Sequence, residues 1–238
     1  MIAFLFTKTP LLFFVQSLWR DEAFTYLLAK QNIINILITT AKDFNPPLYY
    51  LIIHFWIKFF GSSEISLRTV SFIFFWLTIY VLYMILRDIC NIPFKKILIY
   101  LFLAVINPLL LYYAFEARMY TMLAFFATLS SYAFLKKRKS LFLISTVLGL
   151  YTHYFMIFVS IMQIGWYLIL HRKKRNRKEL YYFLTPLFFF LPWLLIVIKV
   201  KGIAAESFWI EKPSLATFIQ LPGIIFTGFE NGLRFYRK

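Results

Sequence analysis

The sequence predicts an all-α protein, a polytopic bundle of about seven transmembrane helices. Of its 238 residues, 61% are apolar, 22% aromatic and only 15% charged, whereas soluble domains are nearer half apolar and a quarter charged. The apolar residues form continuous runs, not the strict alternation over about ten residues that a membrane β-barrel needs. A soluble domain, a disordered chain and a β-barrel are therefore excluded, and the single Cys90 excludes a disulfide framework.

The apolar runs predict where the chain crosses the bilayer. They cover 1–18, 65–87, 97–115, 119–135, 141–170 and 180–198. The run 141–170 is too long for one straight crossing, because about thirty helical residues extend about 45 Å against a core of about 30 Å. Both of its flanks are basic, so it should cross twice and reverse near Tyr151–Tyr154, just after Gly149. This gives seven spans with the amino terminus in the cytoplasm.

The net charge of +16 sets the expected orientation. The basic residues gather in short clusters between apolar runs, above all 136–139 and 172–178. Such clusters are typical of cytoplasmic loops beside anionic lipids, and they argue against a nucleic-acid partner. Residues 19–64 then form a long loop on the outer side.

Short helices are expected within this outer loop, lying in the membrane interface. Asn45 is expected to cap a helix that begins with two prolines and covers 48–60. Thirteen residues are too few to span a bilayer. Tyr50, His54 and Lys58 follow each other at helical spacing and predict a polar stripe on it.

Two adjacent acids, Asp21 and Glu22, follow the first predicted span. One carboxylate could act as a general base while the second orients it or holds a cation. Equally, both could cap the helix over 23–29 and complement its dipole. The local sequence leaves the two interpretations open.

Further polar residues are expected at the outer ends of spans. Arg118, in the turn after Glu116, could bind a phosphate through its forked donors, or extend to the interface, or pair with Glu116. Asn107 and Pro108 should kink the preceding helix and shape a cavity beneath this turn.

Ordinary structural roles are favoured for three more residues. Glu64 and Arg68 are four residues apart, which favours an ion pair along one helix, although a phosphate could compete for Arg68. His153 in the expected reversal is, on its own, more typical of an interfacial hydrogen bonder than of a catalyst.

Taken in order, several short segments resemble a known family. They are WRDEAFT from Trp19, NPPLYY from Asn45, FGSSE from Phe60 with Arg68, EARMY from Glu116, LYTHY from Leu150, and FWI from Phe208 followed by PSL from Pro213. Together they resemble the amino-terminal half of the GT-C membrane glycosyltransferases, in the branch of the protein mannosyltransferases, aminoarabinose transferases and Rgt-like enzymes. Relatives commonly have His where this chain has Asn45, so no role of that His carries over.

The resemblance implies an activity and a set of site residues. It implies inverting transfer of a sugar from a polyprenyl-phosphate donor to a lipid, glycan or protein hydroxyl, at the outer face of a bacterial plasma membrane. Asp21 would act on the acceptor hydroxyl, and Glu22 matches the second acid of the motif. The expected substrate-binding residues are Arg68, Glu116, Arg118, Tyr120, His153 and His54. No cofactor is implied with certainty, and a divalent cation could assist.

Two other functional classes remain open at this point. The first is a transporter or lipid flippase, which should place charges at mid-bilayer in broken helices. The second is a non-catalytic relative that binds polyprenyl phosphate. For domains, 1–199 is expected to be the catalytic membrane unit and 200–238 an extracytoplasmic segment that precedes further spans, so that the chain is an amino-terminal part.

Overall fold

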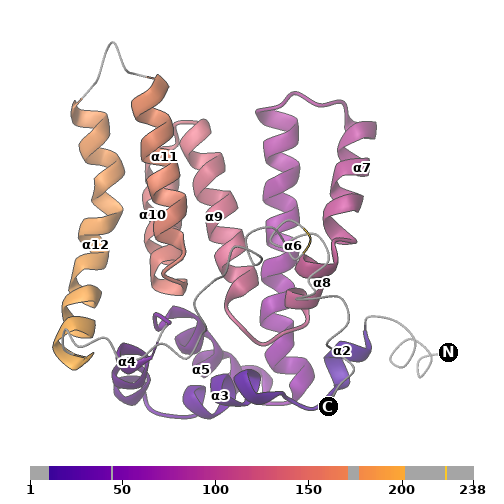
Figure 1. The fold of residues 1–238 in the computed structure, drawn as a ribbon. Helices are drawn as coiled ribbons and strands as arrows, with labels where there is room; N and C mark the ends of the chain where they lie inside the picture. The colour runs from indigo at the N-terminus through magenta and orange to yellow at the C-terminus, as the bar shows by residue number, and fades with distance from the viewer. Residues whose placement is uncertain (1–10, 44, 171–176, 202–222, 224–238) are drawn as a thin grey trace.

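The computed structural model describes residues 11–43, 45–170, 177–201 and 223, and all of its regular elements there are helices (Figure 1). They are α2 (Leu12–Val15), α3 (Arg20–Ala29), α4 (Ile33–Lys42), α5 (Leu48–Phe60), α6 (Glu64–Asp88), α7 (Phe94–Val105), α8 (Pro108–Ala114), α9 (Tyr120–Leu135), α10 (Lys139–Thr152), α11 (Met156–Leu170) and α12 (Arg177–Lys201). The all-α prediction is confirmed for this part of the chain.

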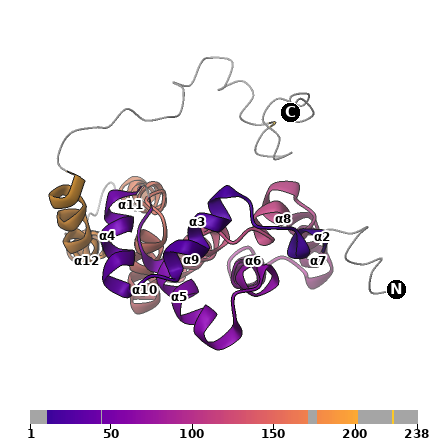
Figure 2. The same cartoon turned by 90° about the horizontal axis from the view of Figure 1, so that it is seen from below.

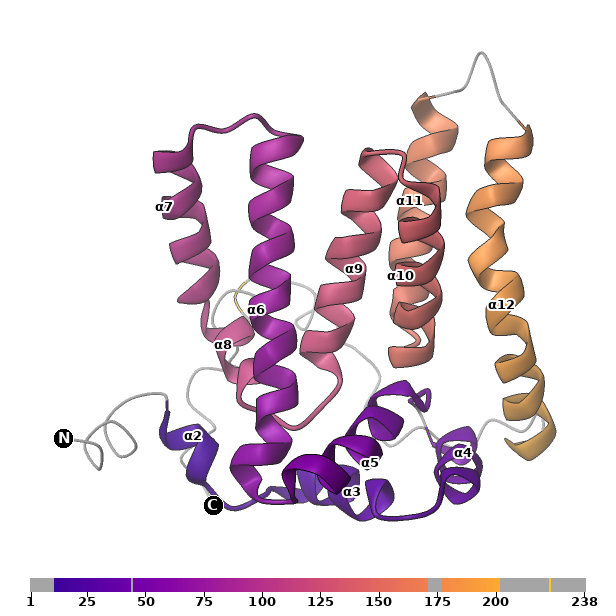
Figure 3. The same cartoon turned by 180° about the vertical axis from the view of Figure 1, so that it is seen from behind.

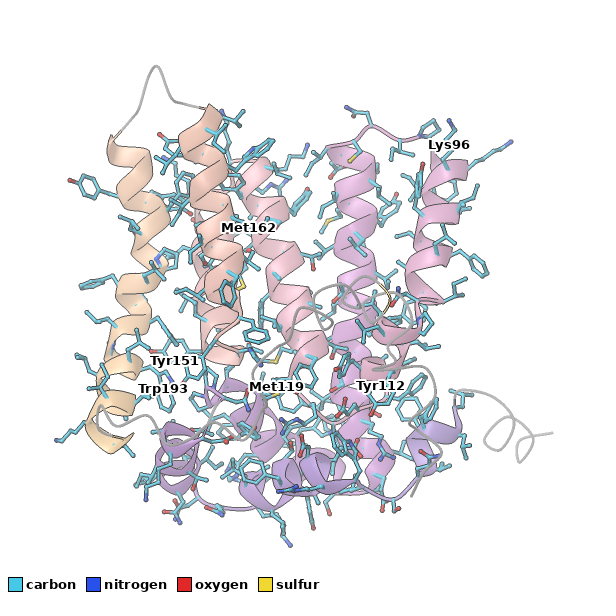
Figure 4. All side chains as sticks on the ribbon, in the orientation of Figure 1. Lys96, Tyr112, Met119, Tyr151, Met162 and Trp193 are labelled. Atoms are coloured by element: carbon cyan, nitrogen blue, oxygen red, sulfur yellow. The ribbon has the colours of Figure 1, made fainter. Side chains whose placement is uncertain are left out.

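The helices form a bundle with two different ends. The helices α6, α7 and α9 to α12 stand side by side, whereas α3, α4 and α5 lie across one end of them (Figures 1 and 2). We call this the cap end, formed by residues 20–43 and 45–60 with the turns 115–119 and 153–155. The connections 89–93 and 136–138 lie at the opposite end, which we call the basic end (Figure 3). Lys96 there is far from Tyr112 and Met119 at the cap end (Figure 4).

A count of seven spans is not shown. Among the described residues, two helical stretches are long and apolar enough to cross a membrane, Glu64–Asp88 and Tyr181–Val200. The pair α7 and α8 makes a third only if it is taken as one broken span. The helices α9, α10 and α11 are apolar but shorter than 18 residues. Of the first predicted span, 1–10 lie outside the described residues, and the helical part of the remainder is only Leu12–Val15.

The predicted kink at Asn107 is confirmed. The chain bends by 67° between α7 and α8. The Asn107 side chain caps α8 by accepting a hydrogen bond from the Leu110 amide at 3.0 Å, and Pro108 occupies a first-turn position, where its missing N–H costs nothing.

The predicted reversal after Gly149 is also confirmed. The helix α10 ends at Thr152 and α11 begins at Met156. A Cβ atom on Gly149 would lie 2.8 Å from the Met156 sulfur. A side chain at Gly149 would therefore require the flexible Met156 side chain to shift.

The outer-loop predictions are partly right. The helix over 48–60 is present with those bounds, and Gly61 ends it with a positive φ of 77°. The prediction of an Asn45 cap is wrong, because Pro47 is the N-cap and no side chain caps this end. The polar stripe also does not face water as a whole: Lys58 is exposed, but Tyr50 and His54 are buried against the protein.

A core of buried apolar residues joins the cap end to the bundle. It includes Leu28 of α3, Ile53 of α5, Leu67 of α6 and Met122 of α9. The site described next therefore rests on packed helices. The predicted boundary at residue 199 is not tested, since 202–222 and 224–238 lie outside the described residues.

Candidate functional site at the cap end

Glu22 is fixed by its position in the first turn of α3. Its Oε2 accepts a hydrogen bond from the Trp19 amide at 3.3 Å, the return half of a capping box. A carboxylate here also complements the positive end of the helix dipole. The capping interpretation of the sequence therefore holds for Glu22.

Glu22 also forms a buried ion pair with Arg68 of α6. The Arg68 Nη2 and Nε atoms lie 2.5 Å and 2.8 Å from its two carboxylate oxygens. The side chains are only 4% and 1% exposed. The expected pair of Arg68 with Glu64 is thus wrong: Glu64 is exposed on the first turn of α6, while Arg68 faces inward to α3.

The remaining polar atoms of this pair bind backbone. Arg68 donates to the carbonyls of Phe14 and Gln16 at 3.1 Å and 2.6 Å. Glu22 Oε1 accepts the Ala117 amide at 2.8 Å. One ion pair therefore connects α3, α6, the segment after α2 and the turn between α8 and α9, and Glu22 has no free oxygen directed at a ligand.

Asp21 is in a different situation, although it is the adjacent residue. Its carboxylate lies 3.6 Å from Nη2 of Arg118, and its side chain is 40% exposed against 8% for Arg118. The Arg118 Nη1 also donates to the Asp21 carbonyl at 3.5 Å. The two residues belong to segments 97 positions apart, so the fold creates this pair, with the carboxylate open to solvent or a ligand.

A buried relay fixes the backbone at Arg118. The Ser71 hydroxyl donates to the Arg118 carbonyl at 3.0 Å. A serine has one hydroxyl proton, so the Tyr49 hydroxyl, 2.8 Å away, must be the donor to Ser71. The helices α5 and α6 thereby hold the turn that presents the guanidinium group.

Polar atoms without partners gather around Arg118. Within the described part of the chain, Arg118 Nε, Tyr50 Oη, Glu116 Oε2 and Thr121 Oγ1 are buried and make no hydrogen bond. Tyr50, Tyr120 and Asp21 are close enough to act on the Arg118 charge. Buried polar groups are nearly always hydrogen-bonded, so this set indicates a place where a ligand completes the bonding.

Tyr50 is a candidate that the sequence did not single out for the site. Its hydroxyl is one of the unpartnered atoms, and its ring packs edge-on to Phe24 of α3. The signal was present, since Tyr50 ends the NPPLYY segment that supports the family resemblance. The spacing alone predicted a polar stripe in the membrane interface, whereas Tyr50 is buried against the protein.

Glu116 is buried in the same turn, at 4% exposure. Burial, together with the nearby Glu22 and Asp21 carboxylates, raises its pKa to about 8, although Arg118 opposes the shift. Glu116 is therefore mainly protonated at neutral pH. It forms no ion pair with Arg118, so that alternative from the sequence is not realised.

Tyr120 and His153 extend the site toward the reversal between α10 and α11. The Tyr120 ring lies near Arg118, at 5.9 Å from its guanidinium carbon, and 6.0 Å from the His153 ring. The His153 Nδ1 accepts the Phe155 amide at 3.1 Å. In the neutral ring the proton is then on Nε2, which is available as a donor.

His54, also expected at the site, has a structural contact. Its Nδ1 lies 2.7 Å from the carbonyl of Ala29, the last residue of α3, and must be the donor there. His54 therefore joins α3 to α5 and is not part of the candidate site. The Glu22–Arg68 pair supports the site from the protein interior. The predicted residues that the structure brings together are Asp21, Glu116, Arg118, Tyr120 and His153.

The described residues contain no group of three or more histidine, cysteine, aspartate or glutamate side chains that could hold a metal ion. The assistance of a divalent cation stays a prediction.

Comparison with known proteins gives one finding. The family model described as dolichyl-phosphate-mannose-protein mannosyltransferase matches residues 45–196. The match includes every site residue above except Asp21 and Glu22, which precede it. No curated protein and no solved structure gives a significant match.

Proposed function

The chain belongs to the dolichyl-phosphate-mannose-protein mannosyltransferase family of membrane glycosyltransferases, and on that premise we propose that its cap end performs an inverting sugar transfer. The family implies a dolichyl- or polyprenyl-phosphate sugar donor and an acceptor. The proposal assigns the chemistry to Asp21 and Arg118. The observation that carries it is the difference between two adjacent acids, one locked and one available.

Asp21 is proposed as the general base. An acceptor hydroxyl must lose its proton as it attacks the anomeric carbon, and one positioned carboxylate suffices for this. Asp21 is 40% exposed and paired only loosely with Arg118 at 3.6 Å. Glu22 has both oxygens bound, and Glu116 is mainly protonated at neutral pH. Of the three carboxyl groups, only Asp21 is free to take a proton.

The presence of a single free carboxylate among these three also supports inversion at the anomeric carbon. Retention through a covalent intermediate needs a nucleophile as well as an acid or base. A single free carboxylate fits direct displacement, in which the acceptor attacks opposite to the leaving phosphate. Glu22 then acts as a positioning residue, because it holds the turn of Arg118 through the Ala117 amide.

Arg118 is proposed to bind the donor phosphate. The leaving group is already a phosphate and needs charge stabilisation more than protonation. Arg118 supplies a buried guanidinium group whose Nε lacks a partner, beside the unpartnered Tyr50 hydroxyl. The Tyr120 ring lies near Arg118 and 6.0 Å from the His153 ring, so the Tyr120 hydroxyl and the Nε2 proton of His153 are proposed as further donors.

An apolar cavity beside the site suits the isoprenoid chain of the donor. It has a volume of about 300 Å³ and is lined by residues of α4, α5, α10 and α12, including Leu37, Leu51, Tyr151 and Trp193. Tyr151 and Trp193 lie in the lower part of the bundle, near the cap end (Figure 4). Because Tyr151 is two residues from His153, a chain held here would bring its phosphate toward Arg118.

Asp21→Asn tests the assignment of the base. Asp21 follows the N-cap Trp19 in the first turn of α3, and Asn keeps the size of the side chain without its charge. The folded protein should therefore persist while turnover falls about a hundredfold or more. The assay is transfer of labelled sugar from polyprenyl-phosphate donors by the chain in membranes. Glu64→Gln, an exposed acid at the same end of the bundle, is the matched control and should keep its rate. A rate within a few-fold of the parent would leave Asp21 as a first-turn residue that only complements the dipole of α3.

The proposed outer face of a bacterial plasma membrane has its own test. In a Cys90→Ser background, Gln31→Cys at the cap end and Ser140→Cys at the basic end are both exposed positions. An impermeant thiol reagent added to intact cells should label Gln31→Cys, and should label Ser140→Cys only after permeabilisation. Labelling of both from one side would contradict the orientation.

A further inference from the structure

A second apolar cavity lies at the basic end, away from the site. It has a volume of about 170 Å³ and lies among the ends of α9, α10, α11 and α12. Six aromatic side chains contribute to its wall: Phe134, Phe142, Trp166, Tyr167, Tyr182 and Phe183. Phe142 and Tyr167 are buried, whereas Trp166 is 52% exposed. The cavity therefore has a closed floor and an aromatic edge on the outside of the bundle.

Three consecutive cations form the mouth of this cavity: Lys137, Arg138 and Lys139. All three are exposed. The ion pairs found among the described residues involve Arg68, Arg87 and Arg118, and none of these three cations. Arg138 and Lys139 instead lie over the rings of Tyr132 and Tyr182, at 5.8 Å each. The mouth has positive charge without a described acidic partner.

The backbone holds these cations in place. The helix α9 ends in a Schellman turn, in which the Arg138 amide donates to the Ala133 carbonyl and the Lys137 amide to the Phe134 carbonyl. Lys137 occupies the left-handed position of this turn, with φ of 55°. Glycine is usual there. The turn thus fixes a lysine at the mouth in a conformation that lysine does not favour.

We propose that this cavity binds an anionic phospholipid of the leaflet at the basic end. The phosphate of the headgroup would lie between Arg138 and Lys139, and the first part of an acyl chain would enter the aromatic cavity. Exposed Leu135, Trp166 and Leu170 extend its wall into the hydrocarbon region. Basic pockets between membrane helices are suited to acidic headgroups, and a free phosphate would leave the apolar wall unused.

This site is distinct from the donor site. The proposed donor phosphate lies at the cap end, and the new cavity lies at the opposite end of the same helices. Its occupant bridges α9, α10, α11 and α12, so it would stabilise the packing of the carboxyl-terminal half of the described bundle. Occupancy does not depend on the proposed sugar transfer, and either proposal can fail alone.

The test uses Trp166 as the reporter. The full chain is reconstituted in phosphatidylcholine vesicles that contain a minor share of either brominated phosphatidylglycerol or brominated phosphatidylcholine. The Trp166 signal is the difference in quenching between the parent and Trp166→Phe. We expect brominated phosphatidylglycerol to quench Trp166 more strongly at equal mole fraction. Equal quenching by the two lipids would overturn the proposal.

A charge-neutralising pair then identifies the headgroup contact. Arg138→Gln with Lys139→Gln should lower the apparent affinity for brominated phosphatidylglycerol about tenfold while quenching by brominated phosphatidylcholine stays unchanged, which shows that the fold persists. Lys95→Gln with Lys96→Gln removes the same charge at the same end, outside the cavity, and should keep the affinity. An equal loss in this control, or relief of quenching by added inorganic phosphate, would contradict a lipid site.

Discussion

The two ends of the molecule hold ion pairs of equal length and opposite character. Arg68 and Glu22 at the cap end are 2.5 Å apart and almost fully buried. Arg87 and Asp88 at the basic end are also 2.5 Å apart, but their side chains are 53% and 19% exposed. Removing one partner of a buried pair leaves an uncompensated charge, whereas water replaces a lost surface partner. The contribution of each pair to stability therefore depends on its burial, because the two distances are the same.

Charged side chains have different roles at the two ends. At the cap end, the buried pair joins four segments and sets the turn that carries Arg118. At the basic end, the exposed Lys137, Arg138 and Lys139 remain without described acidic partners, which is one basis of the proposed lipid site. The cap end uses a buried ion pair to hold the candidate site in place, and the basic end leaves its cations exposed.

Arg68→Met should have the largest effect on stability. It leaves Glu22 buried and unpaired, which typically costs about 3–5 kcal/mol. The apparent unfolding temperature in detergent should fall sharply, and sugar transfer should be lost with it. The measurement is thermal unfolding followed by intrinsic tryptophan fluorescence.

The matched control is Arg87→Met, which breaks the exposed pair and should change the unfolding temperature little. Combining Arg68→Met with Glu22→Gln removes both buried charges and should recover part of the loss. If Arg87→Met were as damaging as Arg68→Met, the contrast between the two ends would be wrong.

Glu116 should make the stability of the cap end depend on pH. Its pKa is raised to about 8 in the folded protein, against an unfolded value near 4.5, so the folded state binds this proton more tightly. The stabilising contribution is complete below about pH 4.5 and is lost as pH rises through about 8. Between pH 6 and pH 9 the loss should be on the order of 2 kcal/mol.

Glu116→Gln tests this dependence, because glutamine keeps the neutral form at every pH. Denaturant unfolding of the variant at pH 6 and pH 9 should show a smaller fall in stability than in the parent. An identical fall in both proteins would show that another group is responsible.

Arg118→Lys should have the smallest of these effects on the folded protein and act on donor binding. Lysine keeps the charge but cannot reproduce the forked geometry of a guanidinium group. The KM for the donor should rise about tenfold, with little change in unfolding temperature. Donor saturation kinetics that match the parent would remove Arg118 from the donor site.

The local sequence was sufficient to predict helix breaks and helix bounds, because these depend on neighbouring residues. Asn107 and Pro108 predicted the break between α7 and α8, and the helix expected over 48–60 is present with those bounds as α5. The same reasoning failed for Arg68, because spacing of four residues favours Glu64 only when nothing else competes. The fold brings Glu22 to Arg68 from 46 residues away, and a buried bidentate partner outweighs an exposed neighbour.

The basic clusters and helix breaks of this helical membrane protein, and most of the residues proposed for its site, could be predicted from the sequence. Apolar runs, prolines and charge clusters act on the residues next to them or on the surrounding medium. Their effects can therefore be predicted without knowing the tertiary structure. The tertiary structure was needed to show that both oxygens of Glu22 are hydrogen-bonded and that the Asp21 carboxylate is exposed. It was also needed to show that His54 joins two helices and that the buried Tyr50 hydroxyl has no partner. Burial and pairing between distant segments set these roles, because a carboxylate or hydroxyl is available for chemistry only when no neighbour has already taken its hydrogen bonds.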